Sequence, residues 1–158
     1  MKEIKLTQGK FAIVDDDDFK KLNQYKWHTC VGKNTFYAIR SVYKINGKQT
    51  TIRMHREIMN APKDIKIDHK FHNGLDNRKE NLRFCNTQQN NFNRKTFNKN
   101  NKLGVKGVCW HNDHKKFMAN IQIDNKIICL GYFNVLGDAD SVYRIAEEKY
   151  FGEFARKC

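Results

Sequence analysis

The strongest constraint on the fold is a strict alternation of apolar and polar side chains in residues 116–123. Successive side chains of a β-strand point to opposite faces, so this pattern predicts a strand with one buried and one available face. The apolar set is Phe117, Ala119, Ile121 and Ile123, and the other set is Lys116, Met118, Asn120 and Gln122.

The residues that follow complete a small module. Asp124-Asn125 predicts a turn into a second strand over 126–133, in which Ile128 and Leu130 can join the same core. Residues from about 135 to 150 carry apolar side chains at helical spacing, namely Ala139, Val142, Tyr143, Ala146 and Tyr150. From Gly104 onward we therefore expect three antiparallel strands covered by one helix.

The first 60 residues predict short strands separated by turns. Residues 11–14 have the composition of a strand, and Asp15 to Asp18 precede the start of a helix. Four acids in a row could bind a metal, but acidic residues are typical of helix N-caps and first turns, which is the interpretation we favour. Residues 35–42 and 49–54 flank Asn46-Gly47, a dipeptide that predicts a β-hairpin.

Composition limits the class of protein. The 158 residues suit one domain or two small ones, and 39% hydrophobic residues suffice for small cores. No apolar run approaches the roughly 20 residues of a membrane span, and the N-terminus does not support a secretory signal. The five cysteines are scattered without a Cys-x-x-Cys pair, which indicates free thiols in a reducing compartment such as the cytoplasm.

The formal charge of +13 indicates a polyanionic partner. The charge is uneven, because residues 1–101 hold 21 Lys and Arg against 10 Asp and Glu, whereas residues 102–158 hold 9 against 7. An anionic membrane is the competing partner, but the sequence has no basic amphipathic helix with a continuous apolar face. Nucleic acid is the favoured partner.

The basic excess surrounds a concentrated set of chemically active side chains. Asp68-His69 ends a short strand that begins at Ile65, and a loop rich in Gly, Asn and Asp follows over 71–78. Asn81-Leu82-Arg83 comes next, and residues 87–94 can form a helix. An imidazole that deprotonates water beside a carboxylate that holds a divalent cation is the minimum needed for metal-assisted cleavage of a phosphodiester.

Asp68-His69, Asn73-Gly74-Leu75-Asp76-Asn77-Arg78, Asn81-Leu82-Arg83 and Asn90-Asn91, in this order, resemble the HNH (ββα-metal) endonuclease motif. The resemblance implies His69 as the general base, Asn81 as the residue that orients it, and Asp68 and Asn90 as metal ligands. Oxygen ligands favour one hard cation, Mg²⁺ first with Mn²⁺ possible, and we expect no structural zinc.

The third region resembles the AP2/ERF-type DNA-binding domain. The resemblance rests on Lys106-Gly107-Val108-Cys109-Trp110, residues 117–121, Leu130-Gly131-Tyr132-Phe133 and residues 139–143. It implies that the sheet contacts DNA through Lys106, Trp110, Lys116, Asn120 and Gln122. Cys109, Ile127 and Cys129 depart from the pattern of plant members, so their sequence specificity does not carry over. The alternative is a sheet that contributes only stability.

Several other side chains have two interpretations each. Arg78, Arg83, Arg94 and Lys95 are candidate phosphate contacts, although Arg78 and Arg83 could equally form ordinary salt bridges. His72 is either a loop residue or a DNA contact, and His55 is a structural or phosphate-contacting residue.

The predicted fold class is α+β. Residues 1–93 form the nuclease domain with a β-rich N-terminal extension, and residues 104–158 form the AP2-like domain. Residues 94–103 form a basic linker between them. This linker is either simply solvated or lies along a DNA groove. The predicted function is that of a site-directed DNA endonuclease of homing or phage type, which nicks one strand of double-stranded DNA as a monomer; a double-strand break would need a dimer or two sequential events. The alternative is a DNA-binding regulatory protein that does not cleave.

Overall fold

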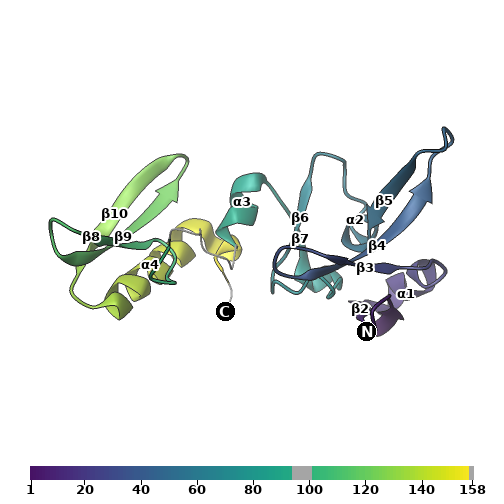
Figure 1. Ribbon diagram of the computed structural model, residues 1–158, viewed down its shortest axis with the longest axis horizontal. Helices are drawn as coiled ribbons and strands as arrows, with labels where there is room; N and C mark the ends of the chain where they lie inside the picture. The colour runs from purple at the N-terminus through teal and green to yellow at the C-terminus, as the bar shows by residue number, and fades with distance from the viewer. Residues whose placement is uncertain (94–100, 157–158) are drawn as a thin grey trace. The chain divides into compact units, whose positions relative to one another are not determined.

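The computed structural model describes residues 1–93 and 101–156, and it has the mixed α and β content predicted from the sequence. The chain divides into two compact units, Met1–Asn91 and Phe92–Arg156, which are called unit 1 and unit 2 below (Figure 1). The predicted contacts Arg94 and Lys95, with most of the predicted linker, lie outside the described residues. Among the described residues, no helix is both long and apolar enough to cross a membrane.

Unit 1 begins with two small antiparallel sheets and two short helices. The first sheet pairs β1 (Lys2–Lys5) with β2 (Phe11–Val14), and the second has the order β3-β4-β5. The remaining bounds are α1 Asp16–Leu22, β3 His28–Val31, β4 Phe36–Tyr43, β5 Gln49–Arg53 and α2 Met54–Ile58. The strand at 11–14 and the hairpin of β4 and β5 confirm the sequence predictions, whereas β1 and β3 were not predicted.

These elements share one apolar core. Its buried residues come from both sheets and both helices, and they are Ile4, Leu6, Ala12, Val14, Leu22, Trp27, Ala38 and Met54. The indole Nε1–H of Trp27 donates to the carbonyl of Leu22 at 2.8 Å, so the one polar atom of this large side chain is satisfied inside the core. Residues 1–58 thus fold around their own core rather than as a loose extension.

The acidic run at the start of α1 lies as predicted, but its carboxylates do not cap the helix. Asp15 is at the N-cap position without a side-chain capping bond, and its Oδ2 accepts the backbone N–H of Lys79 at 2.8 Å. Asp18 pairs with the Lys79 ammonium at 3.0 Å. The run therefore ties α1 to the segment that precedes the last strand of unit 1.

The second half of unit 1 is a strand–loop–strand–helix unit. Strand β6 (Lys66–His69) pairs antiparallel with β7 (Leu82–Cys85), and a short 3₁₀ turn, η1 (Lys79–Asn81), leads into β7. Helix α3 (Thr87–Phe92) follows. Asn86 and Gln89 accept each other's backbone N–H at 2.8 and 2.9 Å, a reciprocal capping box that fixes where α3 begins.

Unit 2 has the three strands and one helix expected from the sequence. The sheet order is β10-β9-β8, and helix α4 packs on one side of it. The bounds are β8 Val108–His111, β9 Lys116–Ile123, β10 Lys126–Phe133, α4 Leu136–Phe151 and η2 Gly152–Phe154. Ala119 and Ile121 are fully buried against α4, whereas Gln122 is exposed, which confirms the alternation in β9.

Gly107 is required where the chain enters β8. Its φ is +70°, and a Cβ at this position would overlap the ring of Tyr143 on α4.

Asn101 and Leu103, which were assigned to the linker, belong instead to unit 2. Asn101 donates to the carbonyl of Val105, and Leu103 packs against the core.

Candidate active site

Strand β6 directs its two chemically active side chains to different surroundings, as adjacent positions of a strand require. Asp68 lies opposite Arg83 on β7, and its Oδ2 accepts from Arg83 Nε at 2.9 Å and from Nη2 at 2.6 Å. Both side chains are at least nine-tenths buried. The guanidinium therefore holds the carboxylate in one place and compensates its charge.

His69 lies in an aromatic cluster with two residues from the first half of unit 1. Its ring centroid is 5.0 Å from that of His55 at an interplanar angle of 89°, and 5.9 Å from that of Tyr37. His55 and Tyr37 also meet edge to face, at 5.8 Å. Tyr37 comes from β4 and His55 from the first turn of α2, so the N-terminal sheet and helix supply two of the rings packed against His69.

An amide fixes the tautomer of His69. Asn77 Oδ1 lies 3.4 Å from His69 Nε2, at the long end of hydrogen-bond distance, while Asn77 Nδ2 donates to the Leu75 carbonyl at 3.1 Å. The second bond settles which end of the amide faces the imidazole. Because Oδ1 can only accept, Nε2 carries the proton in this contact, and Nδ1 has the lone pair.

Burial keeps both imidazoles uncharged. Desolvation lowers the pKa of His69 below its ordinary value of 6.5, against the raising effects of Asn77, Asp68 and Asp76. Desolvation is the largest cause that lowers the pKa of His55 to about 3, and the electrostatic effect of the neighbouring His69 and the charges of Arg53 and Arg56 add to it. A base must be neutral to accept a proton, so His69 has the protonation state that general-base chemistry requires.

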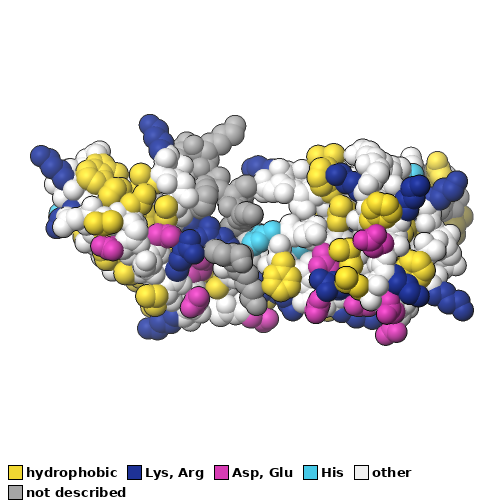
Figure 2. Space-filling model, turned by 90° about the horizontal axis from the view of Figure 1, so that it is seen from below, with side chains coloured by type: hydrophobic (Ala, Val, Ile, Leu, Met, Phe, Trp, Pro, Cys, Tyr) yellow, Lys and Arg dark blue, Asp and Glu magenta, His cyan; other side chains and the backbone are white. Residues whose placement is uncertain are grey.

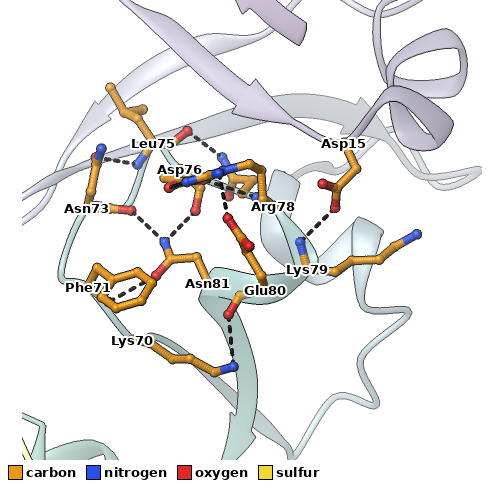
Figure 3. Close-up of polar contacts among 11 residues, drawn as sticks. Asp15, Lys70, Phe71, Asn73, Leu75, Asp76, Arg78, Lys79, Glu80 and Asn81 are labelled. Atoms are coloured by element: carbon orange, nitrogen blue, oxygen red, sulfur yellow. Dashed lines mark hydrogen bonds and ion pairs between the residues drawn. The ribbon is translucent and has the colours of Figure 1, made fainter. Parts of the chain in front are cut away.

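Asn81 holds the loop between β6 and β7 (Figure 3). Its Oδ1 accepts the backbone N–H of Phe71 at 2.9 Å, and its Nδ2 donates to the carbonyl of Asp76 at 2.7 Å. The residue is fully buried. The sequence predicted that Asn81 orients the imidazole, but the amide that meets the His69 ring is that of Asn77, and Asn81 acts on the loop that carries Asn77.

The same loop is joined to the N-terminal sheets through its backbone. Ile13 donates to the Leu75 carbonyl and accepts from the N–H of Asn77, both at 2.8 Å, and Gly74 N–H donates to Thr35 Oγ1 at 2.9 Å. A Cβ on Gly74 would lie 2.8 Å from the ring of Tyr37. Glycine is therefore needed for the loop to approach β4, and residues 1–58 help to shape the site.

The predicted metal ligands agree in chemistry with a hard cation. Asp68 supplies a carboxylate, and Asn90, half-buried on α3, supplies an amide. The described residues contain no group of three or more His, Cys, Asp or Glu side chains suited to a metal ion. Water and phosphate oxygens would have to complete the coordination sphere, which is the usual situation for Mg²⁺.

Arg78 and Arg83, two of the side chains predicted to contact phosphate, are engaged within unit 1. Arg83 pairs with Asp68 as described above, and Arg78 bonds to Asp76 through Nε and Nη2 at 2.8 and 2.7 Å. These pairs agree with the salt-bridge alternative. Arg56 donates to backbone carbonyls of the segment before β6, including that of Pro62 at 2.6 Å. Other cationic side chains remain at the surface of unit 1, beside exposed apolar ones (Figure 2).

Only some of the predicted DNA contacts in unit 2 share a surface. Lys116, Asn120 and Gln122 lie on the face of β9 away from the core. Trp110 pairs in register with Phe117 and contacts its ring at 5.0 Å, which places Trp110 on the helix side of the sheet. Lys106 donates to the Glu147 carboxylate of α4 at 2.5 Å, so it too is held on that side.

Sequence reasoning did not find two aromatic groupings. One is the pair His55 and Tyr37 beside His69, which the sheet brings together from distant parts of the chain. The other lies in unit 2, where Tyr132 contacts His111 and His114 at 5.3 and 4.4 Å between ring centroids. Alternation does not indicate the second grouping, because counting from Ile128 and Leu130 puts Tyr132 on the core side. The register shift between Cys129 and Gly131 turns Tyr132 to the outer face, opposite Met118.

A buried neutral imidazole beside a fixed carboxylate, on a strand–loop–strand–helix unit, is the composition of a metal-assisted nuclease site. The chain is 31% identical over 154 residues to a protein of Acanthamoeba polyphaga mimivirus named an uncharacterized HNH endonuclease, and the match covers 94% of this chain and 74% of that protein. The chain therefore belongs to the HNH endonuclease family. No family model matches the chain, and no solved structure matches it.

Proposed function

We propose that this nuclease is a metal-dependent DNA endonuclease in which His69 is the general base. The observation that carries the proposal is the setting of His69, buried and uncharged between His55, Tyr37 and Asn77, one residue from the Asp68 carboxylate. Each contact limits the orientation of the imidazole, and burial keeps its lone pair available for a proton.

His69, Asn81 and Arg83 have different roles in this proposal. Nδ1 of His69 takes a proton from the attacking water, while Nε2–H faces Asn77 Oδ1. Asn81 fixes the loop that carries Asn77, so it acts as a positioning residue. Arg83 pairs with the buried Asp68 carboxylate and holds it in one orientation.

Asp68 and Asn90 would hold a divalent cation, with Mg²⁺ preferred and Mn²⁺ a substitute. When bound, such a cation stabilises the negative charge that develops on the phosphate. The pairing of Asp68 with Arg83 makes the carboxylate a weaker ligand than an unpaired one, because the guanidinium compensates part of its charge. Weak binding in the absence of DNA would leave the phosphate to complete the site.

We propose duplex DNA as the substrate, and unit 2 as an AP2-like module that binds it. The charge of +13 supports a polyanionic partner, and Lys116, Asn120 and Gln122 form a polar set on the outer face of β9. Asn and Gln side chains match the hydrogen-bonding edge of adenine. One such nuclease site per chain favours a nick by a monomer, and a double-strand break would require two copies or two events.

The Asp68–Arg83 pair also favours a second candidate, a DNA-binding protein that does not cleave. A carboxylate already compensated by a guanidinium suits a fold that works without a cation. Both functions require DNA binding, and only the endonuclease cleaves the DNA.

Supercoiled plasmid incubated with the protein and Mg²⁺ or Mn²⁺ distinguishes the two. We expect wild type to convert the plasmid first to the nicked circle, with chelator abolishing the conversion. The His69→Ala variant should bind the plasmid equally well and leave it supercoiled. Equal nicking by wild type and His69→Ala across several metals would overturn the proposed function, and binding without nicking by wild type would favour the second candidate.

A further inference from the structure

The turn between β4 and β5 exposes large apolar side chains at its apex. The hairpin tip, residues 43–48, contains Tyr43, which is 76% exposed, and Ile45, which is fully exposed. In Figure 1 this tip projects away from the rest of unit 1. A single exposed apolar residue is ordinary, but two of them at the end of a projecting hairpin form a surface with no partner in unit 1.

The tip is well formed, and its conformation does not call for isoleucine. Lys44 N–H donates to the Lys48 carbonyl at 2.9 Å, and Gly47, at φ +74°, donates to the Lys44 carbonyl at 2.9 Å. Asn46 Oδ1 accepts the Lys48 N–H at 3.2 Å, so Asn and Gly supply the turn chemistry. Ile45 supplies neither the side-chain hydrogen bond nor the backbone conformation that the turn needs. A β-branched apolar side chain is disfavoured at a turn apex, and here it adds nothing to the stability of the fold.

The charges around the tip select the kind of partner. Between Asp18 and Glu57 the sequence contains no acidic residue, and Lys44 and Lys48 flank Ile45 directly. The cations of this segment are Lys20, Lys21, Lys26, Lys33, Arg40, Lys44, Lys48, Arg53 and Arg56. An apolar apex between two lysines is complementary to a polyanion that also offers apolar surface, and the base steps of duplex DNA meet both conditions.

The hairpin also connects the tip to the nuclease site. Tyr37, at the start of β4, contacts the His69 ring, and the strand then runs outward to Tyr43. Six residues at about 3.3 Å each span about 20 Å. At about 3.4 Å per base pair, the tip would contact DNA roughly six base pairs from the phosphate cleaved at His69.

We propose that the hairpin tip is a DNA wedge, in which Ile45 and Tyr43 insert at a base step while Lys44 and Lys48 bind the flanking phosphates. This inference rests on the proposed function in that it takes duplex DNA as the partner. Wedges of this kind unstack a step and bend the duplex, which gives the protein more contact with DNA. Two side chains are too small a surface for a stable protein interface, which buries about 800 Å² per partner.

The test uses duplexes with the fluorescent base 2-aminopurine placed at successive positions, and the full-length His69→Ala protein to keep the DNA intact. The duplex comes from the plasmid region that wild type nicks, or is a random-sequence duplex if wild type nicks none. We expect one position, roughly six base pairs from the nick when there is one, to brighten on binding as its base unstacks.

A variant with Tyr43→Ser and Ile45→Ser should lose this brightening and bind roughly tenfold more weakly, with its salt dependence unchanged. The Lys44→Gln, Lys48→Gln variant should instead lower the slope of affinity against salt by about two phosphate contacts. Ile145→Ser, which removes an isoleucine that is 67% exposed on α4 of unit 2, is the matched control and should behave as wild type. The tip variants change only exposed side chains, so their folding should be intact.

Brightening at no position, or equal binding by the Tyr43→Ser, Ile45→Ser variant, would overturn the wedge. The wedge would also be overturned if that variant lost binding to anionic phospholipid vesicles and kept its binding to DNA. Cleavage by wild type is measured separately. Cleavage without brightening therefore refutes only the wedge, brightening without cleavage refutes only the catalytic proposal, and failure to bind DNA at all refutes both.

Discussion

The ring of His55 stands edge-on to the ring of His69, with 5.0 Å between their centroids and an interplanar angle of 89°. Each residue belongs to a different half of unit 1, one to α2 and the other to β6. The contact joins the N-terminal half of the unit to the nuclease motif. The orientation of His69, the proposed base, is therefore constrained by a residue outside the motif.

Truncating His55 should slow catalysis without weakening DNA binding. His55→Ala removes the ring against which His69 packs, so we expect the single-turnover rate to fall by roughly tenfold or more while the Kd for DNA stays the same. His55→Phe keeps an aromatic ring at that position and should recover most of the rate. A rate lost equally in both variants would show that the nitrogens of His55, rather than its packing, matter.

Burial of His55 should make the protein less stable in acid. Its pKa is lowered to about 3 in the folded protein, so between pH 6.5 and 3 the unfolded chain binds a proton that the folded chain does not. The free energy of unfolding should therefore fall as pH falls through this window, by up to about 1.4 kcal/mol per pH unit from His55. Above pH 6.5 the contribution disappears. Urea denaturation should show a shallower pH slope for His55→Phe, and equal slopes would contradict the assignment.

The pH dependence of cleavage should show a base with a depressed pKa. Burial lowers the pKa of His69, so the imidazole stays neutral to a lower pH than an ordinary histidine. At constant metal concentration, we expect kcat/KM to stay level as the pH falls to 6.5. The midpoint of its decline should lie at a lower pH. A decline with its midpoint above pH 6.5 would contradict the environment described for His69.

The Asp68–Arg83 pair should respond to substitution as a buried ion pair. Arg83→Met leaves a buried carboxylate uncompensated, so the free energy of unfolding should fall by roughly 3–5 kcal/mol. Adding Asp68→Asn removes that charge and should recover roughly 2 kcal/mol or more, which urea denaturation can measure as a double-mutant cycle. Simple additivity of the two substitutions would mean that the pair is not coupled.

Local sequence patterns predicted much of this architecture. Alternation placed Ala119 and Ile121 in the core of unit 2, and Asn46-Gly47 predicted the β4–β5 hairpin, because both signals depend on neighbouring residues only. The order of Asp68, His69 and the polar loop likewise indicated a nuclease motif, as the comparison with the mimivirus protein supports.

The contacts within the site were harder to predict. His55 meets His69 because of how α2 and β6 pack, and a sequence separation of 14 residues does not encode that geometry. Asn77 and Asn81 have the same side chain, and only the path of the loop decides which amide meets the imidazole and which bonds to the backbone. Whether Arg78 and Arg83 meet phosphate or carboxylate similarly depends on which acids the fold brings near them.

Single-turnover cleavage of one labelled duplex tests most directly whether His69 is the base of a phosphodiester hydrolase. His69→Ala should lower the rate by roughly 100-fold or more with an unchanged Kd for DNA. His28→Ala, which removes an exposed histidine from β3, should cleave at the wild-type rate. Cleavage by His69→Ala at the rate of His28→Ala would contradict the claim.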